Sequence, residues 1–515
     1  MTETGIQTAE VAEYSQQHQL ETVLTDSVNE ILRTLPPDPF SSLISILKDH
    51  SKPIFTINSI KLINQLCQAF NTIPSLSITM SYKGNKRDIY TYQIPFTAEI
   101  YEKLKDNFDD LYKTFEDFYE VKFINYSIES IEAFDMMLTE IATTQGTDLC
   151  RSLSTAISLS CFYSMALMVD QSLNTFIKNT YPDFIINNEI IPNIGFSLFK
   201  TGKTMNSKVK FEHFILFINN QTKMEPEAIY DLINKIYTTI RKFLTQGKQG
   251  ENGMRLNNEG SYYPPQDTLN DILKLIENII NEVNEKDALY IGIDCNANNY
   301  YNPTAKTYEM DGFKKPPDTD QLIDFYLKLV TDHPLITYLE EPIASEDNDG
   351  WEKIMDKFEE KPNIKIYSKS QGGYKTKKDN NDNVLKTEPI VKSKRKSQLM
   401  LETLSSKLSE GKQPNTEENK PRVDEEEENE INCSISYKIG EISSLSEMIK
   451  EINALKEEGE VSVTIWDNEH ETNNSIPMDI ALGLRVDNII LNGLTKREDK
   501  VSKIIKYLSG IKELY

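Results

Sequence analysis

The sequence predicts an α/β protein whose carboxyl-terminal part is a closed (β/α) barrel, and three observations support this prediction. Short apolar runs recur after about residue 186, most of them precede an amphipathic helix, and ionisable residues close several of the runs. Strands that alternate with helices are typical of βα units around a parallel sheet. With this many units we expect a barrel whose active site lies at the carboxyl ends of its strands.

The elements of the barrel follow from the positions of the apolar runs. We predict strands at His213–Ile218, Leu289–Asp294, Leu335–Glu340, Asn363–Tyr367, Cys433–Lys438, Val461–Asp467 and Asn488–Leu491. Amphipathic helices are predicted at Thr319–Asp332 and Leu445–Glu458. The second of these helices begins with a capping-box pattern, Ser444 and Glu447.

Two short amphipathic helices are predicted from Ser27 onward, after a polar and loose start to the chain. Pro36, Pro37 and Pro39 separate the helices. Their apolar stripes consist of Val28, Ile31 and Leu32, and of Phe40, Leu43, Ile44 and Leu47. So small a helical hairpin cannot bury both stripes by itself. Two interpretations stay open: the hairpin dimerises, or it packs on its own chain.

The segment between the hairpin and the barrel combines strands with helices. Alternating apolar residues over 74–95 flank Lys83, Gly84 and Asn85, which predicts a β-hairpin. Residues 97–180 are predicted to be helical, with a stripe of small residues between Leu153 and Met168 that indicates close helix packing. We therefore expect a mixed α+β segment here.

A charged segment interrupts the barrel. Residues 370–431 contain almost no aromatic residues and run from lysine-rich stretches to the acidic sequence DEEEENE. This composition predicts a disordered insertion between two strands. Its KSKRK stretch is either a localisation or anionic-partner signal, or a solvated run of charge.

Length and charge limit the classes of protein to consider. The 515 residues suggest two or three domains. The chain carries 56 Lys and Arg against 80 Asp and Glu, a net charge of −24. Because binding to nucleic acid requires concentrated positive charge, we expect no nucleic-acid partner.

Cysteines and apolar stretches indicate a cytoplasmic protein. The five cysteines are odd in number and scattered, which predicts neither a disulfide framework nor a zinc site. The first residues do not resemble a secretory signal. The most apolar stretch, Ala156–Val169, is short and rich in serine, so we expect no membrane span.

Ionisable residues close five of the predicted strands. They are Asp294, Glu340, Lys369, Lys438 and Asp467. Because the carboxyl ends of barrel strands meet at one mouth, these side chains are candidates for carboxylate–metal or acid/base chemistry. The alternative, that they only cap strand–loop junctions and pair with each other, stays open.

Several stretches resemble the enolases (phosphopyruvate hydratases). These are IGIDCNANNYYN, HPLITYLEEP, SISYKIGEISSLSEMI and ALGLRVDNIILNG, in this order, with NNEGSYYP resembling the catalytic-acid loop. The proline-rich start and the charged insertion resemble most the divergent enolase-4-like group of sperm and ciliated cells. The hairpin itself resembles the dimerisation/docking helices of cyclic-AMP-dependent kinase regulatory subunits.

The resemblance implies three regions. It implies a docking-like helical segment over residues 1–50, an enolase-like α+β cap over 51–185 and an eight-stranded barrel with an antiparallel start over 186–515. Residues 370–431 are the insertion within that barrel. It also implies a homodimer, and protein partners in the axoneme of a cilium or flagellum.

Some functional positions of the family are retained. The resemblance places the general base on Lys438 and the partner acid on Glu259. It places the first two carboxylates that hold Mg²⁺ on Asp294 and Glu340. The third carboxylate position is occupied by Lys369.

Other positions depart from the family pattern. The residues that grip the substrate phosphate fall on Asp467, Asn468 and Glu469, and a second active-site lysine falls on Ile490. The family's histidine loop would lie near residues 195–205, where this chain has no histidine. The glutamate expected before the strand FILF is shifted: His213 is the aligned residue, and Glu212 lies beside it. No substrate-binding residue is therefore carried over.

These departures predict a catalytically impaired protein. An enolate-like intermediate needs concentrated positive charge, and here acids replace phosphate-binding groups. We hypothesise that Lys369 replaces Mg²⁺ structurally; the alternative is that Lys369 points to solvent and weak metal binding survives. The functions considered are an inactive scaffold of cilia or flagella, a slow enolase, and an enzyme acting on a non-phosphorylated acid.

Overall fold

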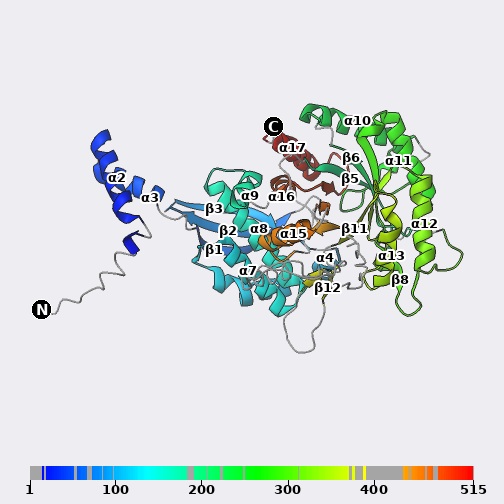
Figure 1. Cartoon of the computed structure of the whole chain (residues 1–515), viewed down its shortest axis with the longest axis horizontal. Helices are drawn as coiled ribbons and strands as arrows, with labels where there is room; N and C mark the ends of the chain where they lie inside the picture. Colours follow the sequence, from blue (N-terminus) through cyan, green and yellow to red (C-terminus); the bar gives the residue numbers. More distant parts are fainter. Residues whose placement is uncertain are drawn as a thin grey trace, which may run out of the picture.

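The computed structural model consists of a helical hairpin, a cap with an antiparallel sheet, and a barrel (Figure 1). It describes residues 14–16, 19–50, 55–66, 72–83, 85–96, 98–182, 191–205, 207–220, 224–246, 250–310, 312–369, 374–376, 387–389, 433–439, 442–458, 461–467 and 474–513. The predicted boundary between residues 185 and 186 lies outside these residues.

The hairpin consists of α2 (Leu20–Thr34) and α3 (Pro39–His50). The Asp38 carboxylate begins α3 by accepting hydrogen bonds from the backbone N–H groups of Phe40 and Ser41, both at 3.1 Å. Helix α2 begins seven residues before the predicted Ser27, because Leu20 and Leu24 extend the same apolar stripe. Figure 1 shows the hairpin projecting away from the cap.

The cap contains a four-stranded antiparallel sheet in the order β3-β2-β1-β4. Its strands are β1 (Phe55–Leu66), β2 (Thr72–Tyr82), β3 (Asn85–Gln93) and β4 (Tyr126–Ile128). The predicted β-hairpin is confirmed by the pairing of β2 with β3, with Tyr82 opposite Asn85. Strand β4 corrects the all-helical prediction for 97–180; three residues are too few for a period to identify.

The helices of the cap cover the sheet. They are α4 (Ala98–Leu104), α5 (Asp109–Phe115), the π-helix η1 (Glu116–Glu120), α6 (Val121–Phe123), α7 (Ile131–Gln145), α8 (Asp148–Met168) and α9 (Leu173–Thr180). Helix α8 is buried along most of its length, including Leu153, Ala156 and Ser160, and it contacts β2 and β3. Its small side chains allow this close approach, as the sequence predicts.

The barrel closes in the order β10-β11-β14-β15-β16-β5-β6-β7. Its strands are β5 (Asn193–Lys200), β6 (His213–Ile218), β7 (Leu289–Asp294), β10 (Ile336–Glu340), β11 (Lys365–Lys369), β14 (Ser434–Lys438), β15 (Val463–Trp466) and β16 (Asn488–Leu491). The seven predicted strands are confirmed within two residues at each end, and β5 was missed. Strand β6 runs antiparallel to both β5 and β7, which confirms the antiparallel start.

Helices surround the barrel. They are α10 (Pro226–Thr245), α11 (Leu269–Val283), α12 (Thr319–Asp332), α13 (Asn348–Glu359), α15 (Leu445–Glu458), α16 (Ile476–Leu484) and α17 (Glu498–Lys512). Short elements join them: η3 (Lys203–Met205), η4 (Gly250–Met254), η5 (Lys286–Ala288), η6 (Ala297–Tyr300), β8 (Tyr301–Asn302) and β9 (Thr307–Tyr308). Helices α12 and α15 have the predicted bounds.

The predicted disordered insertion lies mostly outside the described residues. Within it, β12 (Tyr374–Thr376) pairs antiparallel with β13 (Thr387–Pro389). Tyrosine and threonine favour strands, which is the physical reason for this short ladder inside a charged segment. The basic stretch at 392–396 lies outside the described residues.

No single helix in the described part of the chain is long and apolar enough to cross a membrane. Helices α8 and α9 meet the criteria only as a pair, and they meet at an angle of 97°.

Candidate functional site

The carboxyl ends of the parallel barrel strands bring ionisable side chains together at one mouth. In strand order they are Lys200 on β5, Asp294 on β7, Glu340 on β10, Lys369 on β11, Lys438 on β14 and Asp467 directly after β15. The register places Asp294 opposite both His213 and Glu340 on the neighbouring strands. The mouth predicted from the strand ends therefore exists as a cluster of charge.

Lys369 points into the barrel and pairs with the two carboxylates beside it. Its Nζ lies 3.1 Å from Oδ2 of Asp294 and 3.9 Å from Oε1 of Glu340. Both acids are fully buried, and the Lys369 side chain is only 14% exposed. Burial lowers the pKa of Lys369, but Asp294 and the adjacent glutamates outweigh it and raise the pKa above its ordinary value. The ammonium is thus a fixed positive charge.

Glu340 is held by donors from three strands. Its Oε2 accepts hydrogen bonds from the indole of Trp466 at 2.9 Å, from the Ser436 hydroxyl at 3.3 Å and from the Tyr338 hydroxyl. Burial, followed by the charge of Asp294, raises the pKa of Glu340 to about 7. This carboxyl group is therefore fixed in orientation, and its pKa lies close to neutral pH.

Glu341 adds a third buried carboxylate next to Lys369. It accepts a hydrogen bond of 2.6 Å from the Lys369 backbone N–H and one of 2.7 Å from the Asn298 amide. Burial raises its pKa to about 7 against the opposing effect of the Lys369 charge. Glu341 thereby fixes the backbone from which Lys369 projects.

The residues at the mouth do not fit a divalent cation. Among the described residues, no group of three or more His, Cys, Asp or Glu side chains is placed to hold a metal ion. Mg²⁺ prefers an octahedral shell of oxygen ligands at about 2.1 Å. The Lys369 ammonium group forms ion pairs with the two carboxylates that would provide such ligands.

The two predicted catalytic residues lie at the mouth in different surroundings. Lys438 is half-buried, and its Nζ lies 5.8 Å from the ring centre of Trp466. Glu259 is buried, and its Oε1 lies 2.5 Å from Nζ of Lys200. Glu259 is therefore held in a buried ion pair with Lys200.

The loop that carries Glu259 is built by a side-chain turn. The Asn257 side-chain oxygen accepts hydrogen bonds from the backbone N–H groups of Gly260 at 2.8 Å and Ser261 at 2.9 Å. Gly260 has φ of +109°, a conformation that favours glycine. The turn aims Glu259 at Lys200.

Lys200 is a residue of the site that the strand pattern did not identify. Its Nζ lies 3.6 Å from Oε1 of Glu212 in addition to its pair with Glu259. Burial raises the pKa of Glu212, and the Lys200 charge opposes this effect. The signal in the sequence is the lysine that ends the apolar run GFSLFK.

Asp467 is neutralised by two lysines from α17, which the sequence interpretation missed. Its carboxylate oxygens lie 3.1 Å from Nζ of Lys500 and 2.7 Å from Nζ of Lys503. All three side chains are fully buried. Burial raises the pKa of Asp467, but the two lysines outweigh it and lower the pKa below its ordinary value. The expectation that Asp467 adds uncompensated negative charge to the mouth is therefore wrong.

The remaining predicted positions do not contribute polar groups to the described mouth. Ile490 is buried inside the barrel in a cluster with Trp466 and Tyr338. Asn468 and Glu469 lie outside the described residues. His213, by contrast, is buried at the mouth, where its Nδ1 lies 2.8 Å from the Ser197 hydroxyl and its ring lies 5.1 Å from that of Trp466.

The fold is a TIM-type barrel, and part of it is similar to a known family of barrel domains. Residues 188–367 match the family described as Enolase, C-terminal TIM barrel domain. A curated enolase of Metallosphaera sedula is 31% identical over 124 residues, which are 24% of this chain and 29% of the relative. Enolases of Saccharolobus solfataricus and Sulfolobus acidocaldarius are 27% and 28% identical over 30% and 33% of this chain.

These comparisons support an enolase-like family for the barrel. The chain matches about a third of the length of these curated relatives, 29% to 38%. The matches to the relatives thus cover only part of either protein. The resemblance to the enolase-4-like group stays a prediction.

Proposed function

We propose that this chain is an enolase-like pseudoenzyme that acts as a structural or interaction component. The observation that carries the proposal is the ion pair of Lys369 with Asp294 and Glu340. A permanently bound ammonium takes the place that the family resemblance gives to Mg²⁺. Phosphopyruvate hydration at a useful rate is not expected from such a mouth.

A charge argument supports the proposal. A proton removed next to a carboxylate leaves a highly charged intermediate that only preorganised positive charge stabilises. At this mouth Lys200 faces Glu259 and Glu212, while Lys369 faces Asp294. Two unit charges 4 Å apart interact by about 4 kcal/mol at an effective dielectric of 20. Positive charge already paired at this strength is not available to a substrate anion.

A metal titration tests the first half of the proposal. Calorimetry of the full chain with Mg²⁺ is expected to show no micromolar site. The Lys369→Asp variant supplies a third carboxylate, and we expect it to gain a Mg²⁺ site that disappears when Asp294 is also replaced by Ala. A micromolar site in the unmodified chain that is lost in Asp294→Ala contradicts the proposal.

A second candidate function is an active phosphopyruvate hydratase. Lys438 and Glu259 favour it, because they stand at the positions of the base and acid in the family. A coupled assay of 2-phosphoglycerate turnover separates the two candidates. Turnover above the background of the assay that is abolished by Lys438→Ala supports the hydratase and overturns the pseudoenzyme.

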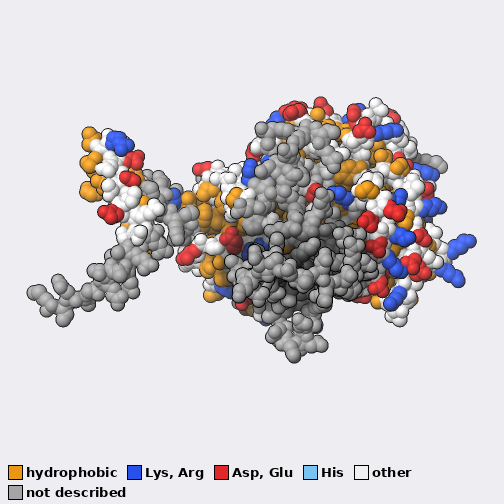
Figure 2. Space-filling model, viewed as in Figure 1, with side chains coloured by type: hydrophobic (Ala, Val, Ile, Leu, Met, Phe, Trp, Pro, Cys, Tyr) orange, Lys and Arg blue, Asp and Glu red, His pale blue; other side chains and the backbone are white. Residues whose placement is uncertain are grey.

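The helical hairpin supports the interaction half of the proposal. On α2, Leu20, Leu24, Val28 and Leu32 are between 39% and 64% exposed, and Phe40 on α3 is 76% exposed. Figure 2 shows this apolar face open on the projecting hairpin. We propose that it pairs with a second copy of the chain, because such a stripe needs a partner to leave water.

Light scattering on the full chain tests this pairing. We expect a dimer, and a monomer for the double variant Leu24→Glu and Leu32→Glu. The matched control is Met136→Glu, on a cap residue of similar exposure at 63%. A double variant that remains dimeric contradicts the role of the hairpin.

The location proposed for the protein is the cytoplasm, including the axoneme of cilia or flagella. This part rests on the resemblance to the enolase-4-like group, which also suggests axonemal protein partners. A fluorescent fusion in a ciliated cell that stays out of the cilium overturns it.

A further inference from the structure

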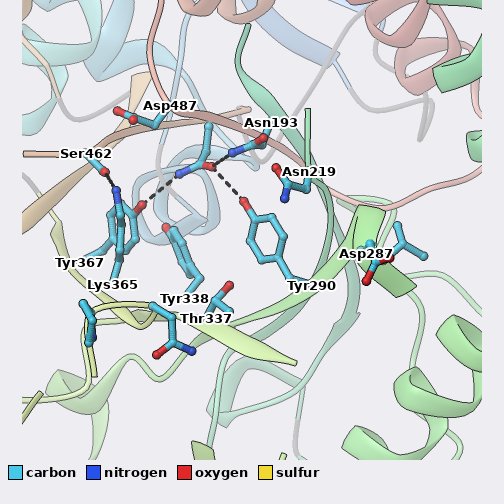
Figure 3. A pocket seen from close by; sticks show the side chains of 14 residues that line it. Asn193, Asn219, Asp287, Tyr290, Thr337, Tyr338, Lys365, Tyr367, Ser462 and Asp487 are labelled. Atoms are coloured by element: carbon cyan, nitrogen blue, oxygen red, sulfur yellow. Dashed lines mark hydrogen bonds between the residues drawn. The ribbon is translucent and has the colours of Figure 1, made fainter. Parts of the chain in front are cut away.

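A second polar region lies at the opposite end of the barrel. A cavity of about 370 Å³ opens there, lined by residues at the starts of the parallel strands and at the end of the antiparallel β6 (Figure 3). They include Asn193 of β5, Tyr290 of β7, Thr337 of β10, Lys365 of β11 and Asn488 of β16. These five residues do not belong to the mouth described above, and the lining residue Tyr338 links the two regions because its hydroxyl donates to Glu340. The proposed function does not rest on this cavity.

Asn488 organises the floor of the cavity. Its side-chain oxygen accepts hydrogen bonds from the Tyr290 hydroxyl and the Asn193 amide, both at 3.1 Å, and its own amide donates to the Tyr367 hydroxyl at 3.0 Å (Figure 3). Asn193 in turn accepts a hydrogen bond of 2.8 Å from the backbone N–H of Asn220. The floor is therefore preorganised by neutral groups before any ligand arrives.

Two carboxylates and one ammonium group line the cavity. Asp487 comes directly before Asn488 and lies half-buried in the wall, where one of its oxygens accepts a hydrogen bond of 2.8 Å from the Val463 N–H. Asp287 is exposed at the rim, and the exposed Lys365 donates a hydrogen bond to Ser462. The lining thus carries one more negative than positive charge, on a protein whose net charge is −24.

An aromatic ring stands between the two carboxylates in the view of Figure 3. Tyr290 is half-buried, and its ring is stacked at 4.6 Å on Phe217, which leaves one ring face turned away from that partner. The charge of Asp487 is also close enough to contribute to the raised pKa values of Tyr290 and Tyr367, after burial. Negative charge and an aromatic ring therefore line the same cavity.

We propose that this cavity binds an organic cation, an alkyl guanidinium or ammonium group. A carboxylate forms its strongest hydrogen bonds with charged donors, and a tyrosine ring attracts cations placed over its face. The volume of the cavity lies within the range of about 300–1,000 Å³ that is typical of small-ligand pockets. An anionic ligand would meet two carboxylates against a single ammonium group. The guanidinium belongs either to a free amine or to an arginine side chain of a polypeptide.

Calorimetry of the full chain with matched ligands tests the proposal. The probes are agmatine, N-acetyl-arginine amide and N-acetyl-citrulline amide, whose urea group has the size of guanidinium without its charge. We expect both cations to bind at least about tenfold more tightly than the citrulline compound. Tighter binding of agmatine points to a free amine as the ligand, and tighter binding of the arginine amide points to a polypeptide side chain.

Variants locate the binding. Asp487→Asn keeps an oxygen for the Val463 N–H and is expected to weaken both cations about tenfold, whereas Lys438→Ala at the other end of the barrel is expected to have no effect. Equal affinity for the citrulline and arginine compounds overturns the proposal whether or not the variant folds. Undiminished binding to folded Asp487→Asn, or no binding of either cation at millimolar concentration, overturns it as well.

Discussion

The two ends of the barrel pair their buried polar groups through different interactions. At the mouth, buried charges compensate one another: Lys369 with Asp294, and Lys503 with Asp467. At the amino-terminal end, the neutral side chain of Asn488 links amides and hydroxyls. Removing one member of a buried ion pair strands a charge, whereas removing one neutral hydrogen bond leaves a smaller defect. The ends should therefore differ in their response to single substitutions.

The largest effect is expected at Lys369. Lys369→Met removes the ammonium and leaves two buried carboxylates facing each other, which should destabilise the barrel by about 3–5 kcal/mol. Chemical denaturation measures the loss, which should grow as pH rises, because removing the Lys369 charge raises the pKa of Glu340 further and protonation at lower pH relieves part of the repulsion.

The matched control for Lys369 is Lys353→Met. Lys353 lies 2.7 Å from Asp320, but the two side chains are 50% and 70% exposed. An exposed pair contributes about 0–1 kcal/mol. Equal losses in the two variants would show that the Lys369 pair is solvated and would remove the contrast between the ends.

Asp467→Asn is expected to have the second-largest effect. It leaves Lys500 and Lys503 buried without their shared carboxylate, although Asp499 still lies 3.3 Å from Lys500. We expect a loss of roughly 2–3 kcal/mol in denaturation experiments. Asp267→Asn, in a pair with Lys208 whose side chains are both 76% exposed, should change stability by less than about 1 kcal/mol. A neutral effect of Asp467→Asn contradicts a stabilising role for this pair.

The pH dependence of stability gives a third, smaller contrast. The folded-state pKa of Glu341 is about 7, above its ordinary value of 4.5. Between these values the folded state binds the proton more strongly than the unfolded state, so the contribution of Glu341 to stability falls as pH rises from 4.5 to 7. Glu341→Gln should flatten the decrease by about 1–3 kcal/mol. Identical pH profiles of variant and unmodified chain would contradict the raised pKa.

The smallest effect is expected at the amino-terminal end. Tyr290→Phe removes the hydroxyl that donates to Asn488 but keeps the ring on Phe217, and we expect a loss of about 1 kcal/mol. The control is Tyr230→Phe on α10, where the side chain is 53% exposed and the change should stay within about 0.5 kcal/mol. A loss at Tyr290 as large as at Lys369 would break the comparison.

Much of the barrel was predictable because its strands are short, apolar and closed by charged residues. The charged residues that end the runs, Asp294, Glu340 and Lys438, predict the position of the mouth from the sequence. Strand β5 was not predicted, because residues 193–200 mix glycine and serine with aromatic residues and show no regular alternation of apolar and polar side chains. The start of α2 at Leu20 was not predicted, because the residues around its first turn are mostly polar.

The pairing of charges was less predictable than their presence. Lys500 and Lys503 are far from Asp467 in sequence, and only the position of α17 beside the barrel brings them together. Their signal was available, since Lys500 lies four residues before Ile504 and Lys503 lies four residues before Tyr507, on the buried face of α17, where a lysine needs a partner. The amino-terminal cavity was not predicted, because the neutral residues that line it, such as Asn488, stand at strand starts and are joined to partners far away in sequence.

The position of Trp466 gives the mouth an optical reporter. The chain contains two tryptophans, and the other, Trp351 on α13, donates its hydrogen bond to the Ala344 carbonyl. The indole of Trp466 donates to Glu340 and lies beneath Lys438, so its fluorescence depends on the proton held by one and the charge carried by the other. In a Trp351→Phe background, a single emission spectrum would follow proton exchange and ligand entry at the mouth in real time.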